Sequence, residues 1–167
     1  GEFSKIVDEG TPVEVANEGI AGLAPMPPLV LVGLVGPAIA LHNSETLHRE
    51  LGERFYVSPN LKALVEAGKR SYDDEGVAEL LTAPESPVEL TAQQVRERVL
   101  GVLAEEVRTM LDDGVAQAPM DIDLAMITGA GFQFWNGGLT PLLDREGVSE
   151  KVTGQRFLPK GVASVPA

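Results

Sequence analysis

The clearest periodic pattern of apolar and polar residues lies between Thr91 and Gly114. Apolar residues recur there at roughly helical spacing, and charged residues occupy most of the positions between them. Thr91 and Gln94 form the T-x-x-Q capping box that starts many helices, and Gly114 is placed to end this one. The pattern therefore predicts one long amphipathic helix. Its apolar positions are Val95, Val99, Val102, Leu103, Val107, Met110 and Leu111.

The rest of the chain also predicts helices. An apolar face over 35–51 ends at Gly52, and residues 119–128 have helical rather than β-branched character. Ser58 before Pro59 is an N-cap followed by proline at the first helical position. No convincing alternating pattern predicts a strand, so the expected fold class is all-α. The apolar face of the 35–51 helix consists of Ile39, Leu41, Leu47 and Leu51, and that of the helix after Pro59 consists of Leu61, Leu64 and Val65.

Two parts of the chain follow one pattern. The segments 6-IVDEGTPVEVANEGI-20 and 110-MLDDGVAQAPMDIDLAM-126 each have two apolar residues, two acids, a glycine, a proline and a short helix, with Asn17 opposite Asp123. Further on, 31-LVGLVG-36 lies over 142-LLDREG-147. We interpret this similarity as a tandem repeat of one helical unit. The alternative is chance resemblance between two amphipathic helical segments.

The repeat sets the expected domains. We expect a first helical domain over 1–72, an acidic linker containing Pro84 and Pro87 over 73–90, a second helical domain over 91–157 and a tail over 158–167. The second copy has a long helix before its glycine, whereas the first has nine residues before Gly10. We therefore expect the first copy to be truncated at its N-terminus, with the body of that helix lying upstream.

Composition and charge narrow the function. The net charge is −12, and residues 73–113 hold 11 acids against 3 bases. Such a chain repels phosphate backbones, which argues against nucleic acid as a partner. The longest apolar stretch, 29–41, is too short and too interrupted to cross a membrane, and no signal peptide pattern is visible. The absence of cysteine fits a cytoplasmic protein.

The sequence offers no convincing catalytic or metal-binding constellation. His42 and His48 are six residues apart on a helix, about 120° around its axis, so Glu45 between them cannot bring both to one metal. There is no cysteine and no G-x-S-x-G motif. Asp121 and Asp123 are interpreted as charges at a helix N-terminus. We therefore predict no catalytic residue and no metal ligand in this chain.

Two loops attract attention. The segment 129-GAGFQFWNGG-138 begins like a dinucleotide-binding loop, but its third glycine position is Phe134 and a predicted helix precedes it. The second loop, 24-APMPPL-29, is stiffened by prolines and occupies the position of 135-WNGGL-139 in the second copy. Such a loop either packs against its neighbours or lines a ligand cleft or an interface.

These residues resemble a known family. The segment 10-GTPVEVANEGIAGLAPMPPLVLVGLVGPAIALHNSETLH-48 is similar to the C-terminal helical domain of 3-hydroxyacyl-CoA dehydrogenases, in which a short helix leads to a P-M-G-P-type loop. The segment 111-LDDGVAQAPMDIDLAMITGAGFQFWNGGLTPLLDREG-147 resembles a second copy of that domain. Tandem copies occur in the multifunctional fatty-acid oxidation proteins, whose N-terminal part is an enoyl-CoA hydratase. The resemblance covers residues 5–152.

The resemblance assigns most of the chemistry to other parts of a parent protein. In the family, NAD binds an upstream Rossmann domain that also carries the catalytic histidine and glutamate. It therefore implies no cofactor and no catalytic residue in this chain. It implies that Pro25, Met26, Pro27 and Pro28, which match P-M-G-P, face the acyl-CoA cleft. Two positions depart from the family, because Pro27 stands in place of a glycine and Gly33 in place of an aspartate that the second copy keeps as Asp144.

The expected partners follow from the same resemblance. They are the upstream Rossmann domain, acyl-CoA, a thiolase subunit and a further copy of the chain. Single-copy relatives pair two helical domains across a dimer, and a tandem second copy takes the partner's place. Phe132, Phe134 and Trp135 would then form a docking surface; the alternative is an ordinary core turn.

The resulting functional hypothesis is a C-terminal region of an NAD-dependent 3-hydroxyacyl-CoA dehydrogenase of fatty-acid β-oxidation that closes the acyl-CoA cleft. The fragment alone would be inactive. One alternative is a non-catalytic helical interaction module derived from that family, and another is an unrelated α-helical scaffold.

Overall fold

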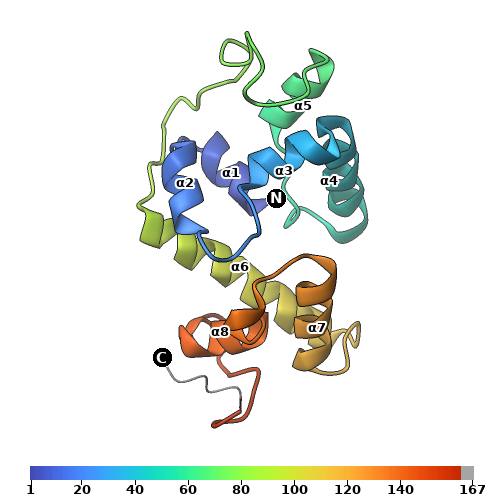
Figure 1. The fold of residues 1–167 in the computed structure, drawn as a ribbon, viewed down its shortest axis with the longest axis vertical. Coiled ribbons are helices and arrows are strands. Elements are labelled where there is room, and N and C mark those ends of the chain that lie inside the picture. The colour runs from blue at the N-terminus through green and yellow to red at the C-terminus, as the bar shows by residue number, and fades with distance from the viewer. Residues whose placement is uncertain (163–167) are drawn as a thin grey trace. The chain divides into compact units, whose positions relative to one another are not determined.

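A computed structural model describes residues 1–162 of the chain as helices joined by loops, with no strand in that range. This confirms the predicted all-α class (Figure 1). The helices are α1 (Glu2–Asp8), α2 (Val13–Gly19), α3 (Pro28–Val35), α4 (Pro37–Leu51), α5 (Pro59–Glu66), α6 (Ala92–Asp112), α7 (Pro119–Gly129), the 3₁₀ turn η1 (Phe134–Asn136), α8 (Leu139–Arg145) and α9 (Val148–Thr153).

Local signals start several of these helices. The Thr91 hydroxyl accepts the Gln94 N–H at 3.3 Å, while the Gln94 side chain accepts the Thr91 N–H at 2.8 Å, so the predicted capping box is confirmed. Ser58 caps α5 by accepting the Leu61 N–H, also as predicted.

The prediction of one helix over 35–51 was wrong at its start. Val35 ends α3, and Pro37 begins α4. Between them Gly36 has φ 101°, a backbone conformation that favours glycine, and the proline that follows cannot continue the preceding helix. The break separates two helices whose axes are bent by 106°.

The chain divides into two compact units. The first comprises Gly1–Gly19 and Met26–Val95, and the second comprises Ile20–Pro25 and the chain from Arg96 onward. The predicted acidic linker 73–90 thus lies within the first unit, and the short segment Ile20–Pro25 belongs to the second.

The first unit packs α1 against α2, and α4 against both α3 and α5. Its core has Leu64 fully buried at the centre. Close packing also joins α2 to the start of α6, because a Cβ added to Gly19 would lie 2.6 Å from the Val95 side chain. The cluster around Leu64 is completed by Leu41, Leu61 and Val77.

The second unit is built around α8, which packs against α7, α9 and η1. Every residue of α8 except Arg145 is buried, including the charged residue Asp144. The Asp144 carboxylate accepts the N–H groups of Phe157 at 3.0 Å and Leu158 at 2.9 Å, and the Ser149 hydroxyl. These bonds hold the segment after α9 against α8. Of the predicted tail 158–167, residues 163–167 lie outside the described range.

Within residues 1–162 no single helix is long and apolar enough to cross a membrane; only the bent pair α3 and α4, taken together, has sufficient length and apolar composition.

The first unit's core provides a stability test. Leu64→Ala removes a fully buried side chain and should lower the free energy of unfolding by about 2–5 kcal/mol. Leu34→Ala, at a position 70% exposed on α3, should change it by about 0.5 kcal/mol or less. Urea denaturation followed by circular dichroism measures both; equal effects would contradict the assigned core.

Candidate functional site

The second unit contains a buried carboxylate that caps a neighbouring helix. Asp123 lies on α7, and its side chain accepts both the Thr140 N–H at 2.7 Å and the Thr140 hydroxyl at 2.6 Å. Thr140 is the second residue of α8, where backbone N–H groups have no partner inside the helix. Asp123 therefore fixes the start of α8 against α7, as an N-cap supplied from another helix.

This cap depends on a glycine. Gly138 precedes α8 with φ 123°, and a Cβ at that position would lie 2.6 Å from the Asp123 side-chain carbon Cγ. Any larger residue would push the carboxylate away from the helix start. The cap is therefore a fitted set of three residues: an aspartate, a glycine and a threonine.

The interpretation of Asp121 and Asp123 as N-terminal helix charges was half right. Asp121 accepts the Ala118 N–H at the start of α7, as expected for a charge at that end. Asp123 was wrongly assigned to the same role, because it is buried and bonded to α8 instead. The repeat pairing of Asn17 with Asp123 was the one sequence signal that marked this position.

Burial raises the pKa of Asp123 above its ordinary value. Hydrogen bonds from Thr140 and Leu139 oppose that shift, and the nearby charge of Asp144 adds to it. A carboxyl group with a raised pKa binds its proton more tightly in the folded protein than in the unfolded chain. Burial thus makes the charged form of the Asp123 side chain less favourable in the folded protein than in water.

The predicted repeat places different residues of the first unit opposite the three residues of this cap. In the repeat alignment Asn17 is opposite Asp123. The alignment of residues 31–36 with 142–147, continued toward the N-terminus, puts Pro27 opposite Gly138 and Leu29 opposite Thr140. The start of α3 has no side-chain cap from its N-cap residue, and Asn17 Oδ1 is buried with no hydrogen-bond partner. The carboxylate, the glycine and the hydroxyl of the second unit's cap are all absent from these positions.

The first unit contains a cavity of about 390 Å³, and Asn17, Pro27 and Leu29 all line it. Its volume is at the lower end of the range for small-molecule pockets. Six of its lining residues are apolar and six are polar. The apolar residues are Val7, Val13, Pro27, Leu29, Val30 and Leu81, and the polar ones are Asp8, Glu14, Asn17, Asn60, Tyr72 and Asp73.

Asp8, the last residue of α1, is hydrogen-bonded to the side chains of three other residues in this part of the first unit. Its carboxylate accepts the Tyr56 hydroxyl at 3.0 Å, the Ser58 hydroxyl at 2.6 Å and the Asn60 side-chain N–H at 2.8 Å. Burial, then the charge of Asp8, raises the pKa of Tyr72 to about 12, so its hydroxyl stays neutral. This network ties the segment before α5 to α1 across about fifty residues of sequence.

The predicted substrate-binding residues lie on both sides of the boundary between the two compact units. Pro25 is exposed and belongs to the second unit, where it lies against Gly131 in an open cavity of about 380 Å³. Pro27 lines the cavity of the first unit, Met26 is half-buried, and Pro28 is the first residue of α3. The structure thus divides this loop between two units.

The aromatic residues of the glycine-rich loop also separate. Phe132 is buried, whereas Phe134 and Trp135 are 70% and 62% exposed and contact each other edge to face, with ring centres 5.3 Å apart. Together with Ile127 and Pro25 they line the open cavity beside Gly131. Phe134 and Trp135 are therefore not part of a core, and whether they dock a partner stays a prediction.

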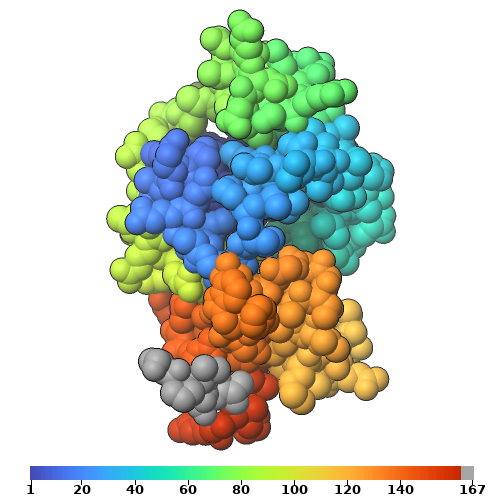
Figure 2. Space-filling model, in the orientation of Figure 1, coloured from blue at the N-terminus to red at the C-terminus, as the bar shows by residue number. Residues whose placement is uncertain are grey.

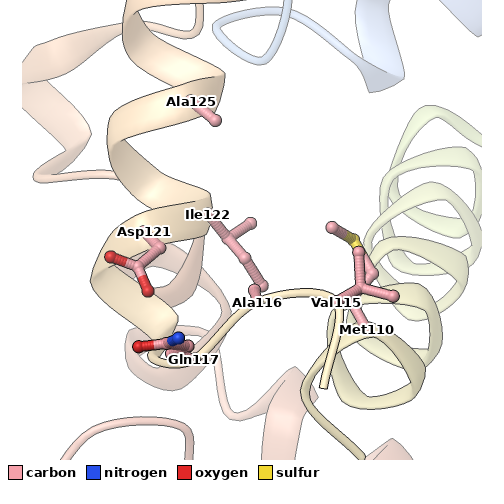
Figure 3. A pocket seen from close by; sticks show the side chains of 7 residues that line it. All are labelled: Met110, Val115, Ala116, Gln117, Asp121, Ile122 and Ala125. Carbon is pink, nitrogen blue, oxygen red and sulfur yellow. The ribbon is translucent and has the colours of Figure 1, made fainter. Parts of the chain in front are cut away.

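A third cavity, of about 350 Å³, lies between the end of α6 and α7. Figure 3 shows Ile122 and Met110 pointing toward each other across it, with Val115 beside Met110. Its lining is mainly apolar, and its one charged side chain, Asp121, already accepts the Ala118 N–H at the start of α7.

The glycine-rich loop lacks the strand context of a dinucleotide-binding motif, and residues 1–162 hold no cluster of metal ligands. The glycine-rich loop follows helix α7 rather than a strand, and Phe132 within it is buried. Within residues 1–162 no group of three His, Cys, Asp or Glu side chains could hold a metal ion. His48 instead contacts the Phe55 carbonyl at 2.9 Å.

Comparison with known proteins gives one consistent result. The chain is 32% identical, over 87% of its length, to the fatty acid oxidation complex subunit alpha of Vibrio campbellii. It is 24% identical over 91% of its length to the subunit of that name from Acinetobacter baylyi. These matches cover 24% and 25% of the two relatives, so the chain spans about a quarter of their length and is a distant relative of these subunits. No protein-family description matches the chain.

The pKa shift of Asp123 predicts a pH dependence. Because the folded-state pKa is raised above 3.8, the carboxyl's contribution to stability is largest below that value and falls as pH rises through the folded-state pKa. Asp123→Asn cannot titrate and keeps the side-chain shape. The free energy of unfolding of the wild type minus that of the variant should therefore be more positive at about pH 4 than at about pH 7. A difference that increases toward pH 7 would mean that the pKa is depressed instead.

Proposed function

We propose that the chain is the C-terminal helical region of an NAD-dependent 3-hydroxyacyl-CoA dehydrogenase of fatty-acid β-oxidation. In the parent protein an upstream histidine, paired with a glutamate, acts as the base that removes the proton of the substrate's 3-hydroxyl group, while NAD accepts the hydride. This chain supplies no catalytic residue. It closes the acyl-CoA cleft and carries surfaces for assembly.

The observation that carries this proposal is the similarity to fatty acid oxidation complex alpha subunits, which extends over 87% to 91% of the chain. Similarity of that extent involves both helical units rather than one shared motif. The all-α structure agrees with a region that packs against an enzyme's catalytic part rather than holding its cofactor. We extend the interpretation to two diverged copies of one helical unit, supported by the same order of short helices around Gly36 and Gly147.

The first unit has a surface suited to such packing. Helix α3 is apolar along its whole length, yet none of its residues is buried. An apolar helix in a soluble protein is normally covered on all sides, so we propose that the upstream Rossmann domain of the parent covers this face. In Figure 2 the atoms of α3 form part of the visible surface. The exposed residues are Val30, Leu31, Leu34 and Val35.

The second unit has a separate candidate surface. Phe134 and Trp135 present two large aromatic side chains to solvent beside an open apolar cavity. Exposed aromatic residues are enriched where proteins dock. We propose that this pair contacts a partner subunit, either a thiolase or a further copy of the chain.

One alternative has specific support. Pro27 and Gly33 replace residues that the resembled family keeps, and the cap set is absent from the first unit. A non-catalytic helical interaction module derived from the family would tolerate both changes. The two functions differ in whether the region supports dehydrogenase activity.

A chimera tests the proposal. The quarter of the Vibrio campbellii subunit that this chain matches is replaced by the chain, and oxidation of NADH with acetoacetyl-CoA is measured. We expect activity well above that of the same subunit lacking this quarter. A chimera that is soluble and helical but no more active than the truncated protein would favour the interaction module.

The α3 face supplies a matched pair of variants. Leu34→Lys places a charge on the proposed interface, and Val115→Lys places one on the loop before α7 at a position of equal exposure, 71% against 70%. In the chimera we expect Leu34→Lys to lower activity by about tenfold or more, because a charge would be buried without a partner. Val115→Lys should leave it nearly unchanged. Equal activities would show that this face stays open to solvent.

A further inference from the structure

The predicted repeat places three lining residues of the first unit's cavity opposite the cap of the second unit. The fitted carboxylate, glycine and hydroxyl are replaced there by Asn17, Pro27 and Leu29, which all line the cavity. Proline cannot approach a neighbouring side chain as closely as glycine, and leucine offers no hydroxyl to a capping group. The substitutions thus remove the packing that closes this position and leave about 390 Å³ open.

One polar atom in the lining, Asn17 Oδ1, is buried without a hydrogen-bond partner. Asp8 is bonded to three side chains, and Asn60 donates to Asp8 while accepting the Thr82 N–H at 2.8 Å. Asn17 Oδ1 is buried and has no partner. A buried carbonyl oxygen without a donor is unfavourable, and a donor brought by a ligand would relieve it after a small rotation of the amide.

The charge of the wall limits the ligand. Three of its twelve residues, Asp8, Glu14 and Asp73, are acids, and none is a base. Phosphate and carboxylate groups would be repelled, so the nucleotide end of a coenzyme does not belong here. The six apolar residues of the lining suit a hydrocarbon chain.

We propose that this cavity binds uncharged molecules that combine a linear apolar chain with an N–H or O–H donor, and that the donor pairs with Asn17 Oδ1. This site goes beyond the proposed function, because it needs neither NAD nor an upstream domain. It differs from the capped position in the second unit, which the Asp123 side chain and Thr140 fill.

Three probes with hydrocarbon chains of similar length test the chemistry. The full chain, labelled with ¹⁵N, is titrated with N-octylacetamide, octyl acetate and octanoate while amide chemical shifts are recorded by NMR. The first has an N–H donor, the second is its shape-matched ester without a donor, and the third carries a negative charge. We expect N-octylacetamide to shift the amides of Val7, Val13 and Leu81, and to bind about tenfold or more tightly than the ester. Octanoate should bind most weakly.

Variants assign the effect to the site. Asn17→Leu should make the amide and the ester bind equally, since the acceptor is gone while an apolar side chain of similar size remains. The triple change Asn17→Asp, Pro27→Gly and Leu29→Thr rebuilds the second unit's cap and should abolish binding of all three probes. Val115→Ser alters the cavity of Figure 3 and should leave binding unchanged. Circular dichroism checks that each variant is folded.

Several outcomes would overturn the proposal. Equal binding of amide and ester by the wild type would mean that Asn17 selects nothing. Shifts confined to residues around Met110 or Trp135 would place the probe in another cavity. Unchanged binding by the folded triple variant, or no binding of any probe by the wild type, would remove the site altogether.

Discussion

Buried and half-buried carboxylates hold this fold together, because most of its helices are too short to be stable alone. Asp144 binds the backbone of Phe157 and Leu158 to α8, and so fixes the segment after α9. In the first unit Asp8 has a similar task and holds the segment before α5 through side chains rather than backbone. Each carboxylate joins parts of the chain that hydrophobic contact alone would leave loosely positioned.

The third carboxylate, Asp123, marks where the two units differ. Its bonds to Thr140 require the close approach that Gly138 permits. With asparagine and proline at the corresponding positions, the first unit has a cavity and an unpaired amide oxygen. If the two units descend from one ancestor, the second kept the packed arrangement while the first exchanged it for space.

Local sequence predicted what local interactions decide. The capping box of Thr91 and Gln94 and the Ser58 cap involve neighbours three residues apart, so the sequence alone identifies them. The all-α class followed for the same reason. The break at Gly36 was missed because apolar residues continue on both sides of it.

The candidate site could not be predicted in the same way. Asp8 and Ser58 are fifty residues apart, and nothing in their spacing indicates that they meet. The prolines 25–28 looked like one ligand-facing loop, but the structure assigns Pro25 to one unit and Pro27 to the other. The pairing of Asn17 with Asp123 drew attention to this position, while the repeat behind it stays a prediction. Its meaning became visible only once Asp123 was seen to be buried.

Backbone amide exchange at two corresponding positions measures this divergence directly. The Thr140 N–H is bonded to Asp123, so it should exchange slowly with solvent deuterium. The Leu29 N–H stands at the uncapped start of α3, so it should exchange much faster, as NMR on the intact chain would record. Equal and strong protection at both amides would mean that Asn17 caps α3 as Asp123 caps α8. The cavity would then be closed and the two units alike.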